Sequence, residues 1–117
     1  KLRVDNYLDN QQKVQTAKLA VYCLKRYATA LDIVSAVTEK RVITFGQIYQ
    51  LVKAQANGGP GPLRVVNGWA NIFLCYGNDG SLWLVGARLY SGGWFFDAYP
   101  LVDPDGWRGG SRVFSRK

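Results

Sequence analysis

The chain has 117 residues, 48% of them hydrophobic and 14% aromatic, which is the composition of a folded globular protein and not of a disordered tail. Fifteen lysines and arginines against eight acidic residues give a formal charge of +7, which favours anionic partners, although many basic domains bind no polyanion. This length predicts a single domain over residues 1–117, with a core that needs no metal or disulfide.

The absence of histidine removes the commonest general base and the commonest transition-metal ligand. The sequence has no run of 18 apolar residues, so we expect neither a membrane span nor a signal peptide. Cys23 and Cys75 each lie in an apolar run, so we expect buried free thiols in a reducing, cytoplasmic environment. No metal-ligand cluster or cofactor motif is present, and we expect neither a metal nor a cofactor.

The longest regular pattern in the chain covers residues 14–37 and contains neither glycine nor proline. Two adjacent apolar stripes follow it with steps of three and four residues: Val14, Ala17, Val21, Leu24, Ala28 and Leu31, then Ala20, Cys23, Tyr27, Ala30, Val34 and Val37. The pattern predicts a long N-terminal helix whose wide apolar face covers a sheet. Leu24 and Leu31 are expected to be buried beneath that sheet.

A second, shorter helix is predicted to follow. Thr44 and Gln47 have the spacing of a capping box, in which each side chain bonds a free backbone N–H of the first turn. We expect this helix to run to about Ala56, with Ile48, Leu51, Val52 and Gln55 on its inner side. It ends before residues 57–62, a stretch rich in glycine and proline.

The seven residues 42–48, Val-Ile-Thr-Phe-Gly-Gln-Ile, resemble the strand–turn–helix opening of the DNA-binding domain in alkyltransferase-like proteins. The resemblance implies a strand that turns directly into a helix. The reactive Pro-Cys-His-Arg signature of that family is absent from this chain, so the resemblance transfers no residue role.

After Pro62 turn-forming residues recur at regular spacing: Asn67-Gly68, Asn78-Asp79-Gly80, Ser91-Gly92-Gly93 and Pro104-Asp105-Gly106. Aliphatic and aromatic runs lie between them, over residues 63–66, 69–76, 81–90, 94–101 and 111–115. This pattern predicts a four- to five-stranded antiparallel meander and, with the two helices, an α+β fold. The alternative is a third helix over residues 62–76, which would give a winged helix; Gly68 disfavours it.

The predicted strands are apolar on both sides, since eleven of the sixteen aromatic residues lie from Trp69 onward. One face must meet the helices. The other is either a surface for a protein partner or a second copy, or it is buried because the sheet curves over it.

Positive charge is interleaved with these aromatic residues. We expect the binding surface to include Arg88, Trp94, Trp107, Arg108, Arg112 and Arg116, with Trp94 or Trp107 exposed for stacking. Asp97 is the one acid inside an aromatic run, and we expect it to face outward or to pair with an arginine such as Arg88. No nucleophile–base pair is visible, so catalysis is not expected and no catalytic residue is assigned.

Three functions remain open on the sequence alone. The preferred one is a small non-catalytic binding module for a protein or anionic partner. The first alternative is a nucleic-acid-binding domain, which fits the charge, and the second is an α+β cone that binds a small molecule in an aromatic pocket.

Overall fold

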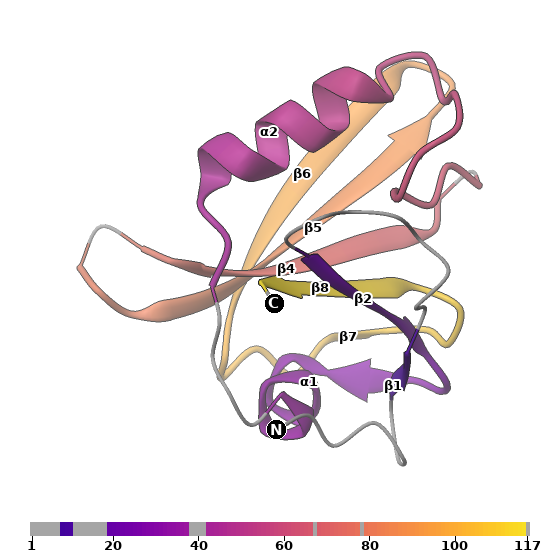
Figure 1. Ribbon diagram of the computed structural model, residues 1–117. Coiled ribbons are helices and arrows are strands. Elements are labelled where there is room, and N and C mark those ends of the chain that lie inside the picture. The colour runs from indigo at the N-terminus through magenta and orange to yellow at the C-terminus, as the bar shows by residue number, and fades with distance from the viewer. Residues whose placement is uncertain (1–7, 11–18, 38–41, 67, 78, 117) are drawn as a thin grey trace.

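The computed structural model describes residues 8–10, 19–37, 42–66, 68–77 and 79–116, which form an α+β fold (Figure 1). Its main sheet has six strands in the order β1-β2-β8-β4-β5-β6. These strands are β1 (Leu8–Asn10), β2 (Leu19–Leu24), β4 (Ala70–Tyr76), β5 (Leu82–Tyr90), β6 (Gly93–Pro100) and β8 (Arg112–Arg116). A two-stranded sheet joins β3 (Ala28–Thr29) to β7 (Gly106–Trp107), and the helices are α1 (Ala30–Ala36) and α2 (Phe45–Ala54).

The expected helix over residues 14–37 is wrong in its described part: residues 19–24 form β2, and the helical residues are those of α1. Its beginning, residues 14–18, lies outside the described residues. The run Leu-Ala-Val-Tyr-Cys-Leu is apolar at consecutive positions, and such a run fits a strand buried on both faces as well as a helix. Backbone pairing with β1 on one side and β8 on the other decides for the strand. Leu24 is buried as expected, but Leu31 on α1 is 58% exposed, so its predicted burial is wrong.

α1 begins at a capping box that the sequence contains but that the helical stripes obscured. The Thr29 hydroxyl accepts a hydrogen bond from the Asp32 backbone N–H at 3.3 Å, and the Asp32 carboxylate accepts one from the Thr29 N–H at 3.0 Å. The two bonds satisfy free donors of the first turn and fix where the helix starts.

The predictions for α2 are confirmed. The Thr44 hydroxyl accepts from the Gln47 N–H at 3.1 Å, and the Gln47 side chain accepts from the Thr44 N–H at 2.9 Å. Ile48 and Val52 are buried against the sheet. Gln55, which follows the helix, is also buried, and its side chain turns toward the loop after α2.

The antiparallel hairpins β4–β5 and β5–β6 form as predicted, with continuous registers from Tyr76↔Leu82 to Ala70↔Arg88 and from Trp83↔Pro100 to Tyr90↔Gly93. The meander stops there, because β8 does not add to β6. β8 lies between β2 and β4, antiparallel to the first and parallel to the second. Residues 63–66 form no strand, and the winged-helix alternative is wrong because residues 70–76 are a strand.

The six-stranded sheet is covered on both faces (Figure 1). On the α1 face, α1 and the β3–β7 pair bury a cluster that includes Leu24, Ile72 and Leu84. On the α2 face, α2 buries a second cluster that includes Phe73 and Phe114. Both faces are therefore core, and no whole sheet face is left for a partner. Within the described residues no helix is long and apolar enough to cross a membrane.

Candidate anion-binding site

The structure separates the residues expected to form one binding surface. Trp107 is only 2% exposed and packs edge-on against Tyr99 at 4.7 Å, so the expectation of an exposed stacking ring there is wrong. Trp94 is half-buried, and its indole N–H donates to the Gln55 carbonyl at 3.0 Å, which ties β6 to the end of α2. Arg88 pairs with Asp97 at 3.4 Å, as expected for that acid.

Arg108 and Arg112, by contrast, come together at the end of the sheet where β4 and β8 begin. Two residues not predicted to bind, Arg64 and Trp69, join them there. The four residues form what we call the Trp69 cluster.

Two buried amides hold the loop that carries Arg64. The Gln55 side chain accepts from the Leu63 N–H at 2.8 Å and donates to the Leu63 carbonyl at 3.1 Å. The Asn71 side chain accepts from the Arg64 N–H at 2.7 Å and donates to the carbonyls of Arg64 at 2.9 Å and Ala87 at 3.2 Å. A side-chain amide carries both donors and acceptors. Gln55 and Asn71 therefore bond the backbone N–H and carbonyl groups of Leu63 and Arg64 as a neighbouring strand would. The backbone of Arg64 is thereby fixed against β4.

Trp69 is the centre of the cluster. The guanidinium carbon of Arg108 lies 3.9 Å from the centre of its ring, and that of Arg64 lies 4.6 Å away. Both distances are those of cation–π contacts, which stabilise a guanidinium over the face of the ring. Gly110 borders the same ring so closely that a Cβ at this position would overlap its Cζ3 atom.

Arg112 completes the cluster from the first position of β8. Its Nη1 donates to the Pro62 carbonyl at 2.5 Å, on the loop that leads to Arg64. Burial lowers the pKa of Arg112, and the positive charge of Arg64 lowers it further. An arginine remains protonated nonetheless, so the two cations repel each other across a partly desolvated space.

No carboxylate neutralises the cluster within residues 8–10, 19–37, 42–66, 68–77 and 79–116. Four of the described acids are engaged elsewhere: Asp32 in the α1 cap, Asp79 with Ser81, Asp97 with Arg88 and Asp103 with the Asp105 N–H. The Nε of Arg64 is buried and has no hydrogen-bond partner there. A buried donor without an acceptor costs free energy, which a bound anion would recover.

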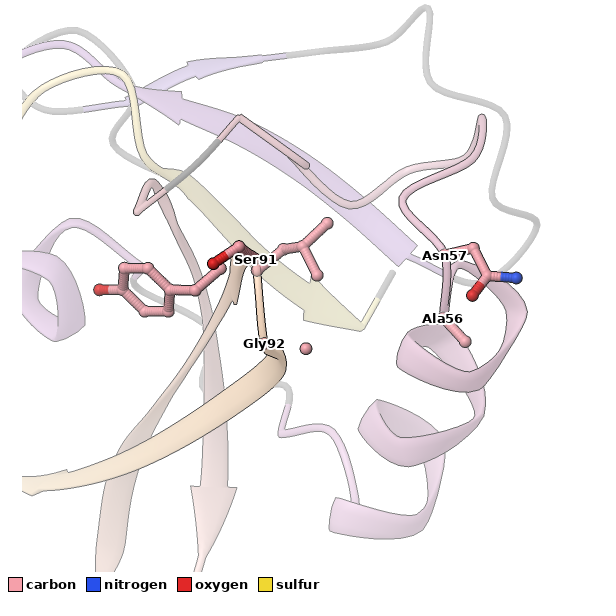
Figure 2. A pocket seen from close by; sticks show the side chains of 7 residues that line it. Ala56, Asn57, Ser91 and Gly92 are labelled. Atoms are coloured by element: carbon pink, nitrogen blue, oxygen red, sulfur yellow. The ribbon is translucent and has the colours of Figure 1, made fainter.

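A depression of about 410 Å³ adjoins this end of the sheet (Figure 2). Ala56 and Asn57, which follow α2, line one side, and Ser91 and Gly92 of the β5–β6 turn line the other. Tyr90, 41% exposed, forms part of its wall. The depression and the cluster are joined through Gly68, whose N–H donates to the Leu89 carbonyl at 3.2 Å and whose neighbour is Trp69.

Arg116 does not belong to the cluster. It is exposed at the opposite end of β8, about 13 Å from Arg112 along the strand. No local sequence pattern could have identified Arg64 and Trp69 as the partners of Arg108 and Arg112. They meet Arg108 and Arg112 only because β8 pairs with β4, with Asn71 beside Arg112.

Comparison of the chain with protein-family profiles, curated proteins and solved structures finds no match.

Proposed function

We propose that this protein is a non-catalytic binding module for single-stranded nucleic acid and that the Trp69 cluster binds the phosphate backbone. The observation that carries the proposal is the meeting of Arg64 and Arg108 over one indole ring, with Arg112 close to Arg64 and no described carboxylate among the three. Two of these three guanidiniums lie over the ring, so they are positioned before a ligand arrives.

Arginine is the side chain best suited to phosphate, since its planar fork can donate two parallel hydrogen bonds to one phosphate group. The buried Nε of Arg64 is one donor already free of water. The net charge of +7 adds long-range attraction for a polyanion. These features favour phosphate over a neutral ligand.

A single strand fits better than a duplex because the neighbouring surface can hold an unstacked base. The exposed ring of Tyr90 lies beside Gly68, the residue before Trp69, and a ring of this kind stacks on any base. Trp69 is not available for stacking, since the guanidiniums of Arg64 and Arg108 lie over it. We assign phosphate contacts to the cluster and base contacts to Tyr90.

The test is fluorescence anisotropy with a short labelled oligothymidylate over a range of salt concentrations. Binding is expected to weaken as salt rises, because each neutralised phosphate releases counterions. Arg108→Ala is expected to lower affinity about tenfold and to flatten the salt slope by about 0.7, the value for one phosphate contact on a single strand. Arg108→Lys keeps the charge and the slope but loses the planar fork, so it should weaken binding without changing the slope.

Arg116→Ala is the matched control, because it removes the same charge from an exposed site outside the cluster. Equal losses of affinity in Arg108→Ala and Arg116→Ala would mean that binding depends only on net charge, and this would overturn the proposed site. Polyglutamate distinguishes the ligand class: competition by polyglutamate as strong as that by unlabelled oligothymidylate would indicate an acidic protein partner instead.

A further inference from the structure

We infer that the free edge of β6 is a homodimer interface, at which two copies of this chain pair antiparallel and join their sheets. The inference rests on the edge of the sheet and does not depend on the proposed nucleic-acid binding, whose phosphate contacts are assigned to the Trp69 cluster at the beginning of β4 and β8. The two share only Tyr90, which contacts Phe95 at this edge.

β6 is the outermost strand beyond β5 and has eight residues. Among the described residues, the backbone groups of residues 93–99 make no hydrogen bond outside the ladder with β5. By comparison, the described part of β1, at the other edge, has three residues. A long open edge is a template for another strand, and proteins usually protect it with lysine, proline or a bulge.

These protections are missing from β6. Its register with β5 runs without interruption from Gly93 to Pro100, so there is no bulge, and proline occurs only at its end. The one charged residue, Asp97, is paired with Arg88 of the neighbouring strand. The remaining side chains on 94–99 are aromatic or alanine.

Aromatic rings stand beside the edge on both faces of the sheet. On the α1 face Phe95, 52% exposed, contacts Tyr90 with ring centres 5.4 Å apart. On the α2 face Phe96 contacts the exposed Phe45 at 5.6 Å. Next to this pair lies an apolar groove of about 260 Å³, lined by residues that include Phe45, Trp83 and the exposed Ala98. Contact with another strand would cover apolar surface above and below the joint.

The geometry of a two-fold pair limits the registers in which a second copy can pair. When two identical strands pair antiparallel, residues opposite each other must lie on the same face of the joined sheet. Pairing of residues 93–99 with themselves places Phe96 on the axis, Phe95 opposite the partner's Asp97 and Trp94 opposite the partner's Ala98. A shift by two residues would place the two Asp97 side chains against each other, and like charges directly opposite are destabilising.

Charge distribution favours the same arrangement. At the end of the sheet with the β4–β5 turn, the charged residues in and after β4, β5 and β6 are acidic: Asp79 lies in the turn, and Asp103 and Asp105 follow β6. Arg116 lies at the same end but on β8, which β4 and β5 separate from β6. The opposite end carries the Trp69 cluster. Antiparallel pairing sets the acidic end of each copy beside the basic end of the other, which is electrostatically complementary.

Sedimentation velocity of the full chain over a concentration series tests the inference, and a reversible monomer–dimer equilibrium is expected. Phe95→Glu places a carboxylate opposite the partner's Asp97 and should raise the dimer dissociation constant about tenfold or more, since the change occurs twice per dimer. Phe95→Lys places a cation there instead, so that an opposite-charge pair forms at each of the two sites. Its dimer dissociation constant should be at least about ten times lower than that of Phe95→Glu. Tyr49→Glu is the control, because Tyr49 is an aromatic residue of similar exposure on α2, away from the edge.

Amide hydrogen exchange provides a readout that needs no variant. Amides of residues 93–99 should gain protection as the protein concentration rises, while those of β1 should not. A monomer at all concentrations, or equal dimerisation of Phe95→Glu and Tyr49→Glu, would overturn the interface. Equal weakening by Phe95→Glu and Phe95→Lys would overturn the register that places Phe95 opposite Asp97.

Discussion

Phe73 and Phe114 stack face to face across the parallel joint between β4 and β8, with ring centres 4.8 Å apart and planes inclined by 18°. Both rings are completely buried on the α2 face. The pair therefore joins strands that are distant in sequence at the middle of the sheet.

Phe114→Ala is expected to destabilise the protein by about 3–5 kcal/mol, because it removes a buried ring and leaves a cavity under α2. Denaturant unfolding followed by circular dichroism measures the loss. Tyr49→Ala, at a half-exposed position on the outer side of α2, should cost less than about 1 kcal/mol. A similar small loss for Phe114→Ala would mean that the core can close around the missing ring.

Leu24 and Leu31 provide a direct test of the chain segment before α2. Leu24→Ala should cost about 2–5 kcal/mol, because Leu24 is buried on β2. Leu31→Ala should change stability by less than about 0.5 kcal/mol, because this side chain is 58% exposed on α1. Equal, large losses in the two unfolding curves would favour the continuous amphipathic helix instead.

Asn71→Leu tests the clamp on Arg64, by which we mean the hydrogen bonds from the Asn71 side chain to the backbone N–H and carbonyl of Arg64. The substitution keeps the side-chain volume but leaves the N–H and carbonyl of Arg64 without their partners, and we expect a loss of about 2–4 kcal/mol. Chemical denaturation measures it, with Asn57→Leu in the exposed turn after α2 as the control. If Asn71→Leu unfolds like the wild-type protein, the clamp contributes nothing to stability.

Cys75 predicts a specific pH dependence. Burial raises the pKa of its thiol from 9.0 to about 11. Below pH 9.0 both folded and unfolded chains keep the proton, so the thiol has no effect on stability. Between pH 9.0 and about 11 the unfolded chain loses the proton first, which stabilises the unfolded state and lowers the free energy of unfolding.

Unfolding of the wild-type protein and of Cys75→Ala across this range isolates the effect, since the other titrating groups are common to both. The free-energy difference between the two proteins should change with pH above 9.0 and stay constant below it. A difference independent of pH would contradict the burial of this thiol. In the native protein, a thiol reagent should modify the half-buried Cys23 before Cys75.

Local signals in the sequence predicted the local parts of the fold. The capping box at Thr44 predicted α2, and the glycine-containing turns predicted β4, β5 and β6. The segment before α2 was misinterpreted because its apolar spacing matches a helix, although Thr29 and Asp32 already had the spacing of a helix start. Its strand character depends on pairing with β8, which lies at the other end of the sequence.

The candidate site shows the same limit. Arg108 and Arg112 were predicted from their density near aromatic residues, but their true partners were not. Arg64 reaches the site through two buried amides, and Trp69 reaches it through the β4–β8 pairing. Trp107 looked equally suitable for binding, but its side chain is buried in the core because β7 pairs with β3.

The position of β8 has a consequence for synthesis of the chain on the ribosome. β8 follows every other described element in sequence, yet it lies between β2 and β4. Until it emerges, β1–β2 and β4–β5–β6 are two fragments, and each presents an unpaired strand with apolar side chains. The joint between them closes only by contacts of long sequence separation, which form slowly. We therefore expect the nascent chain to be most prone to aggregation immediately before β8 is released, when both inner edges are complete and nothing yet covers them.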